Sequence, residues 1–179
     1  MSDRKKLKEI LLEKSVITNK EFTLASGKKS NFYVDARVTT LHPEGAYLCG
    51  KIFLGMLKDF DVNAVGGYSI GADPIVASIA VLSHQAGNPI PAFIIRKEAK
   101  GHGTGKVIEG NFPENGTVAI FDDVVTSGGS ILKGAAQVES QNGKVAVVMA
   151  VIDREDGGKE KIEAAGYKFF SIFTKKDLL

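Results

Sequence analysis

Two adjacent carboxylates, Asp122 and Asp123, follow a run of apolar residues and precede a short turn of hydroxyl and glycine residues. Carboxylate oxygens can accept hydrogen bonds from the two neighbouring hydroxyl groups of a ribose. The turn can hold a phosphate, because backbone N–H groups at a helix start attract anions and glycine lets the backbone come close to them. The candidate phosphate ligands are Thr126, Ser127, Gly128, Gly129 and Ser130. We therefore expect this segment to bind a phosphorylated sugar.

The alternative for this segment is an ordinary strand–loop–helix connection with an acidic helix cap. Two carboxylates at the end of a buried strand, with no basic residue nearby in sequence, favour the binding site.

Residues 96–110 form a second segment that could do chemistry, with four glycines within ten positions and several cationic side chains. So many glycines disfavour a helix or a central strand, so we expect a mobile connection that closes over the substrate as a lid. Lys97, Lys100 and His102 could then stabilise a departing anion, with Arg96 as a better-fixed partner at a strand end. The alternative is a solvated surface loop with ordinary lysines.

This basic loop does not match two common nucleotide-binding patterns. Only three residues separate Gly101 from Gly105, and Val107 stands where a Walker A loop needs Ser or Thr. Ile108 occupies the place of the third glycine of the dinucleotide-binding pattern.

The composition limits the function classes further. The 179 residues suffice for one substantial core, and the net charge of +2 does not suit a general nucleic-acid binder. The single cysteine, Cys49, cannot form an internal disulfide. The sequence has no signal-peptide pattern and no apolar run of the roughly 20 residues needed to span a membrane, so we expect no membrane partner and a cytoplasmic location.

The elements that position these residues alternate between helix and strand. Helical spacing is expected at residues 7–12, and extended pieces at residues 22–37 around the Ser26-Gly27 turn. A longer helix is expected from Pro43 to near Asp61. Further strands are expected at residues 64–67, 92–96, 117–121, 145–152 and 167–173, and further helices at 74–85, 131–141 and 159–165.

This order predicts a single α/β domain, residues 1–179, with a Rossmann-like parallel sheet, helices on both faces and ligands at the carboxyl ends of the strands. Residues from about 1 to 40 are expected to form a small N-terminal cap on a core of about residues 41–179.

Residues 118–130 resemble the signature of the type I phosphoribosyltransferases that binds PRPP (5-phosphoribosyl 1-diphosphate). The strand–helix order around them is similar to the fold of that family. The resemblance implies that Asp122 and Asp123 hold the ribose hydroxyls with Mg²⁺ nearby, without a protein group that is confidently a direct metal ligand. It also implies that residues 126–130 wrap the 5-phosphate.

Residues 96–103, Arg-Lys-Glu-Ala-Lys-Gly-His-Gly, are similar to the catalytic loop of the orotate-specific members, and residues 22–37 resemble their base-binding hood. The resemblance implies a pentosyltransferase that moves ribose 5-phosphate from PRPP to orotate in pyrimidine biosynthesis. It implies that Arg96, Lys97, Lys100 and His102 act on the leaving pyrophosphate. It also implies a homodimer in which this loop reaches the partner's site.

The same resemblance implies two further groups of site residues. Orotate would lie near Arg154, Thr126, Phe32 and Tyr33, and a turn containing Tyr68, Ser69 and Gly71 would line the pyrophosphate. The chain departs from many orotate enzymes at Ala25, where they carry a hood lysine, and at residues 68–71, where some carry another. Lys28 or Lys29 could replace the hood lysine.

Three other readings stay open. A phosphoribosyltransferase for another base would need a different hood. A non-catalytic regulator that binds PRPP or a nucleotide could keep the acidic pair and the phosphate turn but would not need the basic loop. A nucleic-acid module is disfavoured, because the loop lacks interleaved aromatic residues.

Overall fold

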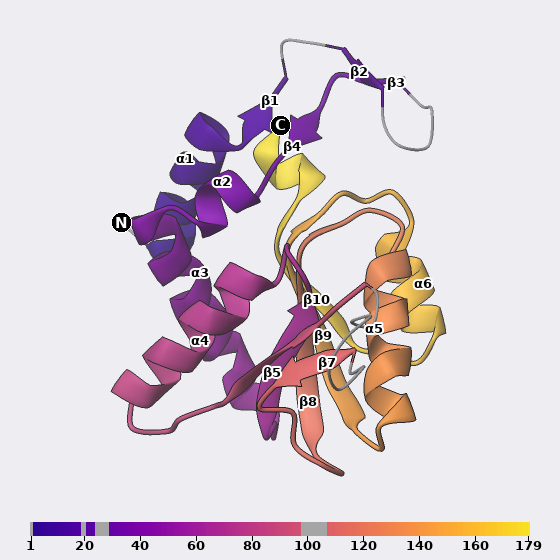
Figure 1. Cartoon of the computed structure of the whole chain (residues 1–179). Helices are drawn as coiled ribbons and strands as arrows, with labels where there is room; N and C mark the ends of the chain where they lie inside the picture. The colour runs from indigo at the N-terminus through magenta and orange to yellow at the C-terminus, as the bar shows by residue number, and fades with distance from the viewer. Residues whose placement is uncertain (1, 19–20, 24–28, 98–106) are drawn as a thin grey trace.

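The computed structural model describes residues 2–18, 21–23, 29–97 and 107–179. Its centre is a six-stranded sheet in the order β10-β9-β8-β5-β6-β7 (Figure 1). Neighbouring strands run parallel except for β7, which is antiparallel to β6 at the edge. The strands are β5 (Ala64–Tyr68), β6 (Ala92–Ile95), β7 (Ile108–Gly110), β8 (Thr117–Val125), β9 (Lys144–Asp153) and β10 (Phe169–Thr174).

Helices cover both faces of this sheet (Figure 1). Successive residues of a strand point to opposite faces, and β8 is buried from Val118 to Phe121. Phe121 packs with Phe53 in one cluster, and Ile120 packs with Ile131 in the other. This confirms the predicted α/β fold. The helices are α3 (Pro43–Met56), continued by the 3₁₀ turn η1 (Leu57–Asp59), and α4 (Asp73–Gln85) on one side, and α5 (Gly129–Ser140) and α6 (Gly158–Ala164) on the other.

The N-terminal part lies beyond the carboxyl ends of the strands, close to the last turn of the chain (Figure 1). Strand β1 pairs antiparallel with β4, and β2 pairs antiparallel with β3. Leu7 and Leu11 of α1 are buried in the same cluster as Phe53, so α1 shares the main core. The elements are α1 (Asp3–Lys14), β1 (Val16–Ile17), β2 (Phe22–Thr23), β3 (Lys29–Ser30), β4 (Tyr33–Val34), α2 (Arg37–Thr40) and the C-terminal 3₁₀ turn η2 (Lys175–Leu178).

Two element boundaries differ from the expectation in a way that matters for the site. Strand β8 continues to Val125, because its pairing with β9 extends to Val125 opposite Asp153. Asp122 and Asp123 therefore lie within the strand and not after it. Residues 108–110, expected in the loop, form the edge strand β7, which Gly110 ends with a φ of 98°.

In the part of the chain that the structure describes, no helix is both long enough and apolar enough to cross a lipid bilayer.

Candidate functional site

A cleft of about 380 Å³ opens where β5, β8 and β9 reach their carboxyl ends. Ligands of open parallel sheets bind at this edge. A smaller hollow of about 100 Å³ adjoins the cleft at the start of α5, and Asp122, Val124, Thr126 and Ser130 line both spaces. The predicted site residues that line the main cleft are Tyr33, Tyr68, Ser69, Gly71, Lys97, Asp122, Asp123, Thr126, Ser130 and Arg154.

The acidic pair is held in place by its own backbone. Oδ1 of Asp122 accepts the N–H of Asp123 at 2.9 Å, and Oδ1 of Asp123 accepts the N–H of Val124 at 2.9 Å. Burial raises the pKa of Asp122 well above its usual range, the charge of Asp123 raises it further, and Lys97 opposes the increase. A ligand that offers hydroxyl groups or a cation to this pair would favour the ionised form.

The raised pKa of Asp122 predicts a pH-dependent cost to folding. A carboxyl group whose pKa is higher in the folded state than in the unfolded state is protonated in both states below its unfolded pKa of about 3.9, and there its contribution to stability is greatest. As the pH rises through the pKa of the folded state, that contribution is lost, because the unfolded state gives up the proton more readily. We therefore expect Asp122→Asn, which keeps the acceptor for Asp123 N–H, to raise the thermal midpoint at neutral pH. The gain should disappear below about pH 4.

Thermal melts of the wild type, Asp122→Asn and Asp61→Asn over this pH range would check the prediction. Asp61 is exposed before β5, at the opposite end of the sheet, and serves as the matched control. A midpoint of Asp122→Asn at or below that of the wild type at neutral pH would show that the buried charge costs nothing.

The turn between β5 and α4, residues 69–72, lies directly beside the acidic pair in the wall of the cleft. Pairing of Gly67 with Phe121 places the end of β5 beside Asp122. The Ser69 hydroxyl donates to Oδ2 of Asp73 at 2.8 Å, and the Ser69–Ile70 peptide bond is cis. Ser69, Ile70 and Gly71 of this turn line the cleft, whereas the first N–H groups of α4, on Asp73, Ile75 and Val76, donate to the carbonyl groups of Ile70 and Ala72.

Gly71 approaches the acidic pair so closely that a side chain does not fit. A Cβ atom there would contact Oδ1 of Asp123 and lie 2.8 Å from its Cγ. We expect Gly71→Ala to displace the carboxylate and to lower kcat/KM by roughly 10- to 100-fold, because a shift of about 1 Å is costly in a reacting site. The thermal midpoint should fall only slightly.

Steady-state kinetics of Gly71→Ala beside Gly55→Ala would check this. Gly55 lies in α3 with nothing within 4 Å of its added Cβ, so this control should keep its activity and gain about 0.5–1 kcal/mol of stability. Equal activity of the two variants would contradict a space limit at Gly71.

The expected phosphate turn lies between β8 and α5. Gly128 caps α5 in the left-handed region, with φ 73°, and a Cβ there would lie 3.0 Å from the Gly158 carbonyl oxygen. Only glycine combines this conformation with this space. Ser127, Gly128 and Gly129 line the smaller hollow, with the first N–H groups of α5 beside them.

Arg154 follows β9 and lines the cleft beside that turn, because its backbone N–H donates to the Val125 carbonyl at 2.9 Å. Its side chain is 9% exposed, and its Nε lies 3.3 Å from Oδ2 of Asp156. The guanidinium carbon lies 5.9 Å from the centroid of the Phe32 ring. Phe32 is buried and is not among the cleft-lining residues, whereas Tyr33 lines the cleft and stacks on Phe22 at 4.9 Å. Phe32 thus lies beside Arg154 in the protein interior and does not face the cleft.

The structure places only some of the basic residues expected at the leaving group in the cleft. Lys97 lines the cleft, but Arg96 does not. Arg96 NH1 lies 3.4 Å from Oε1 of Glu109, because β7 brings that carboxylate beside the end of β6. Lys100 and His102 lie outside the described residues, as do Ala25 and Lys28. Lys29 pairs with Glu21 at 2.7 Å and does not line the cleft.

Some cleft-lining residues were not singled out from the sequence: Val34, Asp35, Arg37, Ile70 and Val124. Asp35 and Arg37 form a two-pronged ion pair, with Nε–Oδ1 and NH2–Oδ2 distances of 2.9 Å. Asp35 raises the pKa of Arg37, and Asp123 raises it further, so this cation faces the acidic pair. The Asp-x-Arg spacing after a predicted extended segment is the signal that could have identified it.

Comparison with known proteins assigns the family. An orotate phosphoribosyltransferase of Aquifex aeolicus is 42% identical over 181 residues, covering 100% of this chain and 99% of the relative. The orotate phosphoribosyltransferase of Mycobacterium tuberculosis, solved with Fe(III) dicitrate, aligns with a TM-score of 0.88 at 37% identity over 99% of both chains. The same enzyme solved with PRPP aligns with a TM-score of 0.84 at 35% identity, again over 99% of both.

A scan against models of protein families gave no match. The full-length identities and the shared fold are sufficient without one, and they show that the chain belongs to the orotate phosphoribosyltransferase family.

Proposed function

We propose that this chain transfers ribose 5-phosphate from PRPP to orotate, forming orotidine 5′-monophosphate and pyrophosphate in pyrimidine biosynthesis. Family membership supports this activity. One observation carries this proposal. The acidic pair, the turn at the start of α5 and the buried Arg154 line two adjoining spaces at the carboxyl ends of the strands. PRPP carries a diol and phosphates, and orotate carries a carboxylate, so each substrate has complementary groups here.

Each part of PRPP has a proposed partner. Asp122 and Asp123 accept hydrogen bonds from the ribose hydroxyls. The turn of residues 126–130 binds the 5-phosphate through backbone N–H and hydroxyl groups. The turn containing Tyr68, Ser69 and Gly71 binds the pyrophosphate, since it lines the same cleft directly beside the acidic pair.

The reaction exchanges one bond at ribose C1 for another. The C1–O bond to pyrophosphate breaks, and its electron pair leaves with the pyrophosphate. A ring nitrogen of orotate gives up its proton, which the leaving pyrophosphate can take up, and bonds to C1. Positive charge therefore develops on the sugar and negative charge on the leaving group. The basic loop supplies Lys97, Lys100 and His102, which stabilise the leaving group. Arg154 binds the orotate carboxylate beside Thr126 and Tyr33, and Phe32 supports it.

The donor set fits Mg²⁺ that arrives with PRPP. Among the described residues no group of three or more His, Cys, Asp or Glu side chains could hold a metal ion. Mg²⁺ commonly binds through one or two carboxylates together with substrate phosphates, and the adjacent Asp122 and Asp123 offer that. Bound there, Mg²⁺ would neutralise part of the pyrophosphate charge.

A base-specificity assay with PRPP and Mg²⁺ tests the proposal directly. Orotate absorbance should fall with time, and adenine, guanine and uracil should react far more slowly. Turnover with another base but not with orotate would mean a different phosphoribosyltransferase. PRPP binding without turnover of any base would mean a regulator of the same fold.

We also propose a homodimer in which the basic loop serves the partner's site, and a cytoplasmic location. Lys100→Ala and Asp123→Asn chains, each nearly inactive, can be unfolded and refolded together. If the loop crosses the interface, one site of each heterodimer combines the intact Asp123 of one chain with the intact Lys100 of the other. Random mixing should then restore about a quarter of all sites.

Activity that stays at the level of the separate mutants, with heterodimers verified by tags of different mass, would place the loop in its own subunit. Refolded wild type gives the reference for full recovery.

A further inference from the structure

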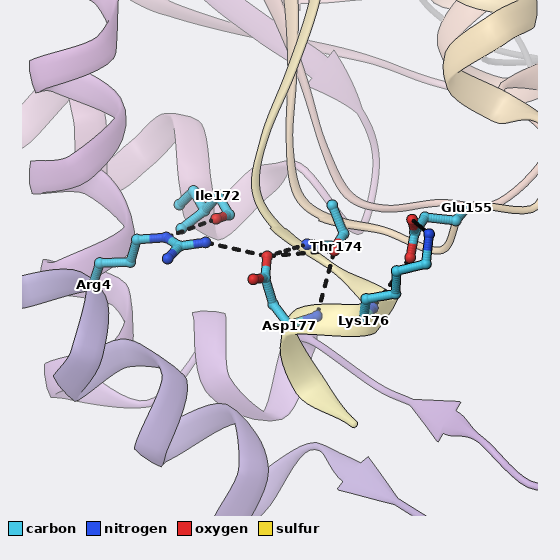
Figure 2. Close-up of polar contacts among 6 residues, drawn as sticks. All are labelled: Arg4, Glu155, Ile172, Thr174, Lys176 and Asp177. Atoms are coloured by element: carbon cyan, nitrogen blue, oxygen red, sulfur yellow. Dashed lines mark hydrogen bonds and ion pairs between the residues drawn. The ribbon is translucent and has the colours of Figure 1, made fainter.

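The backbone that carries Arg154 is held by a contact from the C-terminal turn. Glu155, the next residue, accepts the backbone N–H of Lys176 at Oε2, 3.1 Å away. Its Oε1 lies 2.9 Å from Nζ of the same lysine (Figure 2). The two residues lie 21 positions apart in sequence, so this contact joins the β9–α6 loop to η2.

The loop needs such a contact, because Glu155 adopts an unfavourable backbone conformation. Its φ of 56° lies in the left-handed region, which costs a residue other than glycine about 1–3 kcal/mol unless its surroundings hold it. Its N–H donates to Oδ1 of Asp153 at 2.9 Å. The tight turn thus directs Arg154 toward the cleft and places Asp156 against its Nε.

The C-terminal turn is itself anchored to distant parts of the chain. Thr174 and Asp177 form a reciprocal cap, in which Thr174 N donates to Oδ2 of Asp177 at 2.9 Å. Arg4 of α1 donates to the Ile172 carbonyl and to Asp177 Oδ2, both at 3.1 Å (Figure 2). Its guanidinium also lies 4.9 Å from the centroid of the Phe173 ring. Glu155 therefore contacts a turn that is itself anchored to α1 and β10.

A second contact links the same turn to the arginine side chain. Lys175 Nζ lies 5.8 Å from the centroid of the Phe32 ring, and the Arg154 guanidinium carbon lies 5.9 Å from it. Phe32 is only 3% exposed, so its ring cannot move without disturbing its packing. Contacts with η2 thus hold both the backbone next to Arg154 and the ring that lies beside its side chain.

We infer that Glu155 is a positioning residue for Arg154, and that its contact with Lys176 fixes the base-binding side of the cleft. The inference rests on the proposed role of Arg154 toward orotate. Backbone N–H groups of β8 hold Asp122 and Asp123, and Glu155 and Lys176 line neither the cleft nor the smaller hollow, so loss of their contact should affect orotate more than PRPP.

Kinetics of Glu155→Ala test this. We expect KM for orotate to rise roughly 5- to 20-fold, with kcat and KM for PRPP within about twofold of wild type, since a misplaced arginine weakens one substrate only. Glu155→Gln keeps an acceptor for Lys176 N–H and should recover most of the affinity. Glu155→Gly removes the same contacts but also the backbone strain, so it should fold at least as well as Glu155→Ala and show the same rise.

A double-mutant cycle separates positioning from general damage. In an Arg154→Met background, Glu155→Ala should add less than about twofold to KM for orotate, because both changes act through one side chain. Additive effects, or an equal rise in KM for PRPP, would overturn the inference. An unchanged KM for orotate in Glu155→Gly would also overturn it. If the wild type does not use orotate at all, the proposed function itself fails, independently of Glu155.

Discussion

Replacing Asp123 by asparagine is expected to lower kcat/KM for PRPP by roughly 10- to 150-fold, because a hydrogen bond between a charged group and a ribose hydroxyl contributes about 1.5–3 kcal/mol. Asparagine keeps an oxygen that can accept the N–H of Val124, which Asp123 Oδ1 accepts at 2.9 Å. The strand end should therefore stay in place. The introduced NH₂ group donates and cannot accept from a ribose hydroxyl or favour a cation.

Kinetics with PRPP and orotate, together with thermal melts, would measure both effects. Asp61→Asn serves as the matched control, because it removes an exposed carboxylate at the other end of the sheet. We expect the thermal midpoint of Asp123→Asn near that of the wild type. Unchanged kinetics would remove the diol-binding role, and a large fall in the midpoint would assign Asp123 a structural role instead.

Sequence patterns predicted the layers of this fold because the central strands β8 and β9 of the parallel sheet are buried on both faces along much of their length. Such strands read as continuous apolar runs between helices of distinct period, as at Val145 to Ile152 in β9. The patterns could not predict the end of β8, because Asp122 and Asp123 interrupt its apolar run and pairing with β9 continues the strand past them. They also missed β7, which exists only because β6 offers it a free edge.

The candidate site could be predicted only where its residues are contiguous. The segment from Asp122 to Ser130 contains a strand end, a turn and a helix start, so its chemistry can be read locally. Arg96 could not be placed this way, since its distance from the cleft follows from Glu109 on another strand. The position of Arg37 near Asp123 and the contact between Lys176 and Glu155 could not be predicted either, because both join segments that are distant in sequence.

The second large effect is expected at Arg154. Arg154→Met should raise KM for orotate by about 100-fold, because truncating one partner of a desolvated charge pair costs about 2–5 kcal/mol. Methionine is a flexible apolar side chain that can fill the space over Phe32, so the buried wall should stay packed. KM for PRPP should change little, since the ribose and phosphate partners lie on β8 and α5.

Uracil, which lacks the carboxylate of orotate, supplies the control. If Arg154 binds that carboxylate, the wild type should prefer orotate to uracil strongly, and Arg154→Met should lose most of this preference by weakening orotate alone. Arg154→Lys keeps the charge but not the two-pronged geometry, so it should fall between the two. A preference that survives in Arg154→Met would mean that another group, and not Arg154, recognises the carboxylate.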